Sequence, residues 1–222
     1  MNIPKQTLSD IVVNARSFIR SILFLLLLAL SLGLINYSLR YFDTSIQTKF
    51  LLRKEHLRHS LYFPAFYTHI TSAGFVLLLG LFQFFAKTWL YRIRLHRLLG
   101  KIYVFLVLFA AAPSGLVMAV YASGGIWVNA CFILLSLLWW TFTFISYQSI
   151  RQCNVTEHGN YMLRSYALTI SAIMLRLYGF VFTYILGSIS EYTYGWLAWL
   201  SWVPNLLLIE LIIHNQKKQN SA

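Results

Sequence analysis

The fold of this chain is decided by the run SILFLLLLALSLGLINYS, which extends from Ser21 to Ser38 and contains no charged residue. An α-helix that crosses the hydrocarbon core of a bilayer needs about 20 mostly apolar residues. Lipid offers the backbone no hydrogen-bond partners, so a spanning segment has to satisfy its own polar groups, as a helix does. We therefore predict that this run is a membrane-spanning helix.

Five further apolar stretches of similar length follow it along the chain. They are residues 64–86, 101–122, 125–147, 165–186 and 192–213. The sequence thus predicts an all-α fold, a polytopic transmembrane bundle of about six spans. It forms a single membrane domain over residues 1–222, with the lipid bilayer as its partner.

Composition supports lipid as the solvent. Hydrophobic residues make up 59% of the chain and charged residues 11%, whereas a soluble domain carries about a quarter charged residues. The net charge of +12 comes from 18 Lys and Arg against 6 Asp and Glu. These basic residues lie in short segments between apolar runs and form no basic helix face. They indicate contact with anionic lipid headgroups and argue against nucleic acid as a partner.

Basic residues also predict how the chain is oriented. They gather before the first span, between the second and third, between the fourth and fifth, and after the sixth: Lys5, Arg16, Arg20, Lys87, Arg92, Arg94, Arg97, Lys101, Arg151, Arg164, Lys217 and Lys218. Because such residues favour the cytoplasmic side, we expect both termini to be cytoplasmic. The segment 40–58 does not fit this orientation, because it is basic and would face outside. Residues 40–62 are predicted to be external, with an interfacial helix among them.

The third predicted span contains Pro113 within the small-residue stretch from Ala110 to Gly115. Proline removes a backbone hydrogen bond and kinks a helix, while small residues let a neighbouring helix approach closely. Packing geometry alone accounts for this pattern, and a cavity beside the kink is the alternative. The following Ser123-Gly124-Gly125 predicts a tight turn between helices.

Arg176 is the first candidate functional residue, because it lies twelve residues into the fifth predicted span. A guanidinium at this depth is costly unless it is paired, so it marks a functional site by default. No carboxylate is expected at the same depth. Arg176 bonds to backbone carbonyls, to tyrosine hydroxyls such as those of Tyr178 and Tyr184, or to an anionic ligand. The alternative to a ligand site is a structural arginine that holds helices together.

Two histidines, His96 and His158, lie at the cytoplasmic starts of the third and fifth spans. The positive end of the helix dipole disfavours imidazolium there, and a neutral imidazole can ligate haem iron. The pair is a candidate for the axial ligands of a haem b, with nearby arginines such as Arg164 reaching its propionates. Two histidines in wet headgroups are the alternative. His69, in the second span, is a candidate for a substrate path or for one wall of a quinone pocket, and otherwise lies near the outer headgroups.

Two motifs carry a family resemblance. They are His96-Arg97-Leu98-Leu99-Gly100-Lys101-Ile102-Tyr103, and the run from His158 to Thr169, HGNYMLRSYALT, with Arg176 beyond it. They resemble the bacterial membrane-protein family catalogued as domain of unknown function 2306 over roughly residues 65–190. The resemblance implies a multi-pass protein of the bacterial inner membrane, and it implies that His96, His158, Arg164 and Arg176 belong to one site.

The start of the third span, with His96 and then Gly100, is also distantly similar to the haem-bearing helices of b-type membrane cytochromes. The chain departs from that pattern because it lacks a second pair of histidines across the membrane. A complete electron path is therefore not expected from this likeness.

Three hypotheses for function remain at this point. The first is a redox function that uses haem or a quinone at a polar site near the cytoplasmic face. This site would consist of His96, His158, Arg164 and Arg176. The second is a small transporter for an anion or for protons, with His69 and Arg176 on the path. The third is a structural or assembly protein without catalysis. No nucleotide-binding, zinc or nucleophile motif is present, and neither enzymatic activity nor oligomeric state follows from the sequence.

Overall fold

The computed structural model describes residues 5–43, 49–52, 54–85 and 93–221. Within these ranges every regular element is helical. The segments long and apolar enough to cross a membrane number six: Ser17–Leu39, Tyr62–Phe84, Ile93–Val120, Ile126–Arg151, Val155–Leu186 and Glu191–Gln219. This confirms the predicted all-α, polytopic bundle.

Four of the six spans are single helices: α1 (Lys5–Leu39), α3 (Tyr62–Phe85), α6 (Ile126–Arg151) and α7 (Val155–Leu186). The other two are composite. The third consists of α4 (Ile93–Leu106), the π-helical turn η3 (Val107–Ala111) and α5 (Ala112–Val120), and the sixth of α8 (Glu191–Leu200) and α9 (Val203–Ser221). Both breaks lie next to a proline, Pro113 in α5 and Pro204 in α9, because proline cannot donate the hydrogen bond that continues a helix.

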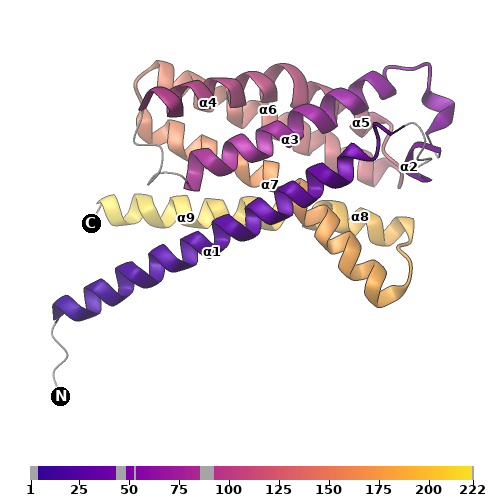
Figure 1. Ribbon diagram of the computed structural model, residues 1–222. Helices are drawn as coiled ribbons and strands as arrows, with labels where there is room; N and C mark the ends of the chain where they lie inside the picture. The colour runs from indigo at the N-terminus through magenta and orange to yellow at the C-terminus, as the bar shows by residue number, and fades with distance from the viewer. Residues whose placement is uncertain (1–4, 44–48, 53, 86–92, 222) are drawn as a thin grey trace.

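The bundle has two distinct ends. We call the end that carries the starts of α1, α4 and α7 and the end of α9 the basic end (Figure 1). The opposite end, which carries the turn of residues 121–125 and the start of α8, is the turn end. The described parts of both termini lie at the basic end. That this end is cytoplasmic stays a prediction from its positive charge.

The turn between α5 and α6 depends on glycine. Gly124 and Gly125 have φ angles of 110° and 79°, which are unfavourable for residues with a side chain. A Cβ on Gly124 would also lie 2.7 Å from Val128 Cγ2. The turn therefore closes tightly and sets α5 against α6 over most of their lengths.

Helix α7 occupies the centre of the bundle. It packs most extensively against α6 and also contacts α3, α8 and α9. The run from Ser165 to Thr169 on α7 is buried throughout, which is possible only where protein surrounds the helix on several sides. Helix α7 is thus the element on which side chains from most other helices converge.

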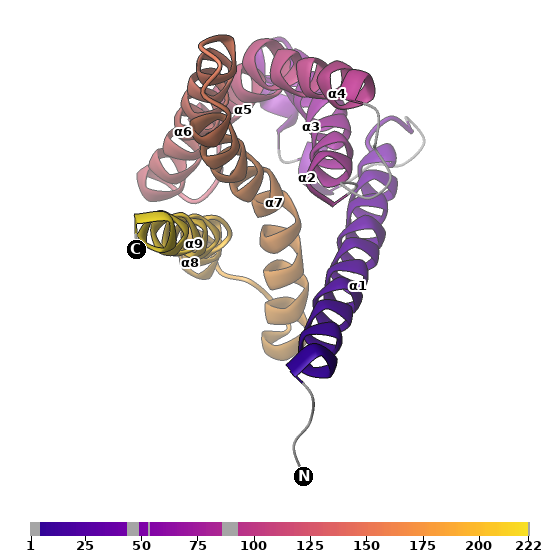
Figure 2. The same ribbon diagram turned by 90° about the vertical axis from the view of Figure 1, so that its left-hand side faces the viewer.

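Helix α1 lies at the edge of the bundle (Figure 2). Only 6% of its most apolar 18-residue window is buried by the rest of the chain, and its contacts are mainly with α3. Side chains such as Phe18, Leu25 and Leu32 are more than half exposed. A helix this apolar and this exposed is stable only when lipid covers it.

The segment between α1 and α3 forms no long interfacial helix in its described part. It contains α2 (Lys49–Leu52) and the 3-10 turn η1 (Glu55–Leu57), while residues 44–48 and 53 lie outside the described residues. Lys54 is 8% exposed, and its Nζ donates a hydrogen bond of 2.6 Å to the carbonyl of Tyr121 at the end of α5. Its ammonium group also lies 5.7 Å from the centre of the Tyr62 ring. One basic residue of this segment therefore caps a helix C-terminus.

Substitution of Lys54 tests this cap, and it should also change how the stability of the protein depends on pH. Lys54→Met should cost about 1 kcal/mol, because the Tyr121 carbonyl loses its partner. Burial lowers the pKa of Lys54 below its usual 10.5, so between that lowered pKa and 10.5 the unfolded chain binds more protons than the folded one. The stability of the wild type should therefore rise over this window relative to Lys54→Met.

The measurement is thermal unfolding in detergent from neutral pH to about pH 11, with Lys101→Met, an exposed lysine of α4, as the matched control. A wild type that lost stability relative to Lys54→Met as the pH rose through the window would contradict the assignment.

Candidate functional site

His158 belongs to the first turn of α7, which is capped by Asn154 through a hydrogen bond from the Glu157 amide. Its Nδ1 lies 3.0 Å from the carbonyl oxygen of Ser146 and 2.9 Å from the Ser146 hydroxyl on α6. Because a carbonyl only accepts, this contact assigns the hydrogen to Nδ1. A neutral His158 then has a lone pair on Nε2, which suits a hydrogen-bond donor or a metal ion.

His96 lies in the first turn of α4 at the basic end, and its side chain is exposed. Its backbone carbonyl accepts a hydrogen bond of 2.9 Å from Gln83 of α3. The backbone at His96 is therefore fixed to the bundle. The imidazole contacts of His158 are made with α6 and do not involve His96.

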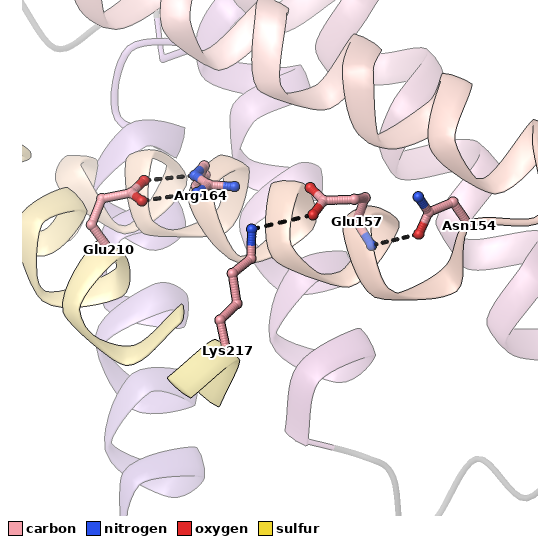
Figure 3. A network of polar contacts seen from close by, with 5 residues as sticks. All are labelled: Asn154, Glu157, Arg164, Glu210 and Lys217. Atoms are coloured by element: carbon pink, nitrogen blue, oxygen red, sulfur yellow. Dashed lines mark hydrogen bonds and ion pairs between the residues drawn. The ribbon is translucent and has the colours of Figure 1, made fainter. Parts of the chain in front are cut away.

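Arg164 forms the strongest ion pair of the described chain. Its Nε and one terminal nitrogen donate to the two carboxylate oxygens of Glu210 on α9, at 2.6 and 2.8 Å (Figure 3). The guanidinium also lies over the ring of Tyr161, 4.7 Å from its centre. Fork-like pairing of this kind satisfies both charges. Arg164 thus ties α7 to α9.

A second ion pair supports the same interface. Lys217 of α9 lies 3.4 Å from Glu157, the residue whose amide is capped by Asn154 (Figure 3). Lys217 is 60% exposed, so water and salt screen this pair, and it contributes little. The α7–α9 interface therefore depends mainly on Arg164 and Glu210.

Buried hydroxyl groups form a network in the middle of the bundle. The hydroxyl of Tyr103, on α4, lies 2.9 Å from that of Ser165 and 3.0 Å from that of Thr169, both on α7. Thr143 of α6 lies 2.7 Å from Ser165. The indole N–H of Trp139 adjoins Tyr103 but makes no hydrogen bond of good geometry. Three helices are thus held together by polar groups that lipid cannot solvate.

His69 lies nearer the turn end, on α3. Its Nδ1 donates a hydrogen bond of 2.8 Å to the carbonyl of Ala111, which ends the π-helical turn η3. Its ring fits against Gly115 of α5, where a Cβ would lie 2.9 Å from the ring carbon Cε1. The side chain is partly exposed, and Nε2 has no hydrogen-bond partner among the described residues. The histidine is therefore fixed at one nitrogen and available at the other.

Arg176 projects from α7 toward the same region. Its hydrogen bond runs to the carbonyl of Ala172 in its own helix, at 3.3 Å, and it forms no ion pair with any described residue. The guanidinium is within electrostatic reach of His69 on α3 and of Tyr194 on α8. The positive charge of Arg176 is thus left without a negative partner in the described chain.

Two tyrosines from the end of α1 complete the surroundings of Arg176. Tyr37 and Tyr41 lie within electrostatic reach of the guanidinium. Burial, together with a hydrogen bond to Tyr37, raises the pKa of Tyr41 to about 12. Tyr41 is therefore a neutral phenol at physiological pH and does not neutralise Arg176. Side chains from elements far apart in sequence thus lie within electrostatic reach of one guanidinium.

The family model described as "Predicted membrane protein (DUF2306)" matches residues 66–213, which is more than half of the chain. The chain belongs to this family. No curated protein and no solved structure matches it. The matched region of this DUF2306 protein includes His69, His96, His158, Arg164 and Arg176. Tyr37 and Tyr41 lie outside it.

The structure divides the residues predicted for one site in the DUF2306 chain. His158 and Arg164 lie at the basic end, each bonded to a residue of another helix. Arg176 is twelve residues beyond Arg164 on α7, about 18 Å along the helix axis. Its surroundings are His69 and tyrosines instead. The pairing of Arg164 with Glu210 was not anticipated from the sequence. Tyrosines were expected near Arg176, but Tyr37, Tyr41 and Tyr194 were not the ones named.

Proposed function

We propose that this DUF2306 protein binds a small anion at Arg176 and carries it across the membrane. The observation that supports the proposal is the guanidinium of Arg176, which has no carboxylate partner in the described chain. An unpaired charge at this depth costs several kcal/mol. A bound anion would supply the missing charge, and the neighbouring tyrosines would supply hydroxyl donors.

Arg164 provides the internal comparison, because it is on the same helix and is fully paired with Glu210. An arginine that only holds helices together is expected to look like Arg164. Arg176 instead donates a hydrogen bond to one carbonyl of its own helix, and its side chain is exposed. This contrast favours ligand binding over a structural role at Arg176.

His69 can take up a proton when the proposed site binds an anion. Its Nδ1 is already a donor to Ala111, so Nε2 becomes a donor to an anion only after it takes up a proton. A bound anion would accept a hydrogen bond from the protonated Nε2 and offset its charge. The site would therefore load an anion and a proton together. The buried hydroxyl groups of α6 and α7 would provide polar groups between the proposed anion site and the basic end.

Flux through liposomes tests the transport. Purified protein would be reconstituted with internal potassium chloride or potassium nitrate, and anion efflux followed after valinomycin and a protonophore are added together, so that neither charge nor protons limit the efflux. We expect protein-dependent efflux of at least one probe, reduced at least about tenfold in Arg176→Gln and partly retained in Arg176→Lys. Arg151→Gln, an exposed arginine at the end of α6, is the control. Equal efflux in the wild type and Arg176→Gln, or none for either probe, would overturn the proposal.

Stability separates binding from a structural role at Arg176. Arg176→Leu should raise the melting temperature in detergent, because it removes an uncompensated charge, with a net gain of about 1–2 kcal/mol after loss of the tyrosine contacts. The wild type alone should gain stability from added sodium acetate or chloride beyond the ionic-strength effect seen in Arg176→Leu. A marked loss of stability in Arg176→Leu would instead support the structural role.

Haem binding between His96 and His158 is the second candidate. His158 favours it, because its bonded Nδ1 leaves a lone pair on Nε2, the ligand that haem iron takes. Arg164 fits the group less well, because a propionate would have to displace Glu210. An absorption spectrum of protein from haem-replete cells tests this role, with a Soret band that His158→Ala removes as the expected sign. Colourless protein would exclude it.

A further inference from the structure

A hollow of about 300 Å³ opens at the turn end. It is lined by Gly124, Trp127, Glu191, Tyr192, Gly195 and Trp196. Three of these residues are aromatic and one is a carboxylate. Because the hollow lies between the α5–α6 turn and the start of α8, it is at the level of the lipid headgroups.

The three rings meet at steep angles. The rings of Trp127 and Trp196 are 6.5 Å apart and inclined by 65°, and those of Tyr192 and Trp196 are 6.2 Å apart and inclined by 79°. Trp199 covers one side of Trp127 at 4.9 Å and fixes that ring. None of the three rings stacks face to face on another of the three. Trp127, Tyr192 and Trp196 are each at least half exposed, so ring surface remains open to a ligand.

Glu191 supplies the charge. It is the first residue of α8, after the capping residue Ser190, and it is exposed. In the described chain it forms no ion pair. A belt of Trp and Tyr at the headgroup level is common in membrane proteins. A glutamate in the first turn of a helix interacts favourably with the positive end of the helix dipole. Neither of these explains why three rings and a free carboxylate surround one hollow.

We propose that this hollow binds an alkylammonium cation, such as the choline or ethanolamine group of a zwitterionic lipid. Faces of Trp and Tyr attract large, weakly hydrated cations, and quaternary ammonium groups are the ligands that aromatic cages recognise. Glu191 adds a counter-charge at the rim. A metal ion such as sodium keeps its water more tightly and gains less from the rings.

Gly195 provides a test that changes neither charge nor ring. A Cβ there would lie 3.3 Å from Trp127 Cδ1, so a larger side chain would fill the hollow. Gly195→Leu should therefore abolish binding. Glu191→Gln and Trp196→Leu change side chains that are exposed, so the fold should tolerate both.

The experiment is a titration of the full chain, in an uncharged maltoside detergent, with tetramethylammonium chloride against sodium chloride at the same ionic strength. The readout is tryptophan fluorescence. We expect a saturable change for tetramethylammonium alone, with the half-saturating concentration raised roughly tenfold by Glu191→Gln and by Trp196→Leu. Glu157→Gln, a carboxylate at the basic end, should bind as the wild type does.

A second arm identifies the source of the cation. Phosphatidylcholine added to the micelles should compete with tetramethylammonium if the natural ligand is a lipid headgroup, while phosphatidylglycerol with the same chains should not. Binding that phosphatidylcholine leaves unchanged would assign the hollow to a water-soluble alkylammonium. The inference is overturned if tetramethylammonium has no saturable effect, or if the effect persists in Glu191→Gln, Trp196→Leu and Gly195→Leu alike.

Discussion

Replacing Gly80 by alanine should destabilise the protein by about 3 kcal/mol, although it adds a single methyl group. Gly80 lies on α3 where the ring of Tyr166 crosses from α7, and a Cβ there would overlap this ring. The same Cβ would lie 3.1 Å from the ring of Tyr103. Tyr166 is 5% exposed and stacks on Phe84 at 5.0 Å, so it has little room to move. The clash therefore has to separate α3 from α7.

The measurement for Gly80→Ala is thermal unfolding in detergent beside Gly159→Ala. Gly159 lies near the start of α7 with nothing within 4 Å of an added Cβ. The control should gain about 0.5–1 kcal/mol, because alanine loses less backbone entropy in a helix. In a Tyr166→Ala background the cost of Gly80→Ala should largely vanish, since the two residues share one space. Equal effects at the two glycines would contradict the packing described for α3 and α7.

Breaking the Arg164–Glu210 pair is the second large effect we expect. Arg164→Leu should cost about 2 kcal/mol, because it leaves the Glu210 carboxylate without its partner in a membrane span. We place the value below that of a fully buried pair, since the Glu210 side chain is 44% exposed. Glu210→Leu should cost a similar amount for the converse reason. The double variant should be close to the wild type, because it leaves no charge behind.

A double-mutant cycle on melting temperatures measures this coupling directly. The exposed pair of Lys217 and Glu157, on the same two helices, is the matched control, and its coupling should be near zero. Additive effects of Arg164→Leu and Glu210→Leu would show that the two groups do not depend on one another. In that case α9 would be held to α7 by apolar packing alone.

The number and type of spans could be predicted because hydropathy reports where a chain meets lipid. Hydropathy does not report where a helix begins. Residues 155–164 are polar and were left out of the predicted fifth span. They are nevertheless helical, since Asn154 caps α7 at Val155. In the same way α4 begins at Ile93, before the predicted start at Lys101. The predicted spans are therefore the most apolar parts of longer helices.

The candidate site was harder to predict, because its partners come from other helices. Depth along each span can be read from the sequence, and Arg164 and Glu210 are both near the basic ends of their spans. Rotation about the helix axes cannot be read in this way. Tyr37 lies near the end of a peripheral span and Tyr41 just after it, so no sequence pattern connected them with Arg176. The runs around His158 and Ser165 are explained mainly by packing, since these residues bond to α6 and α4.

The π-helical turn from Val107 to Ala111 sets the rotation of α5 relative to α4. Such a turn holds one residue more than an α-helical turn, so its five residues advance the chain by about the same angle as four residues of a regular helix. If all five residues wound as a regular helix, α5 would rotate by close to 100° relative to α4, and Gly115 would turn away from His69. In-frame loss of a single codon within 107–111 would instead join the two halves as one regular helix and leave Gly115 facing His69, so this contact survives one triplet fewer at this point.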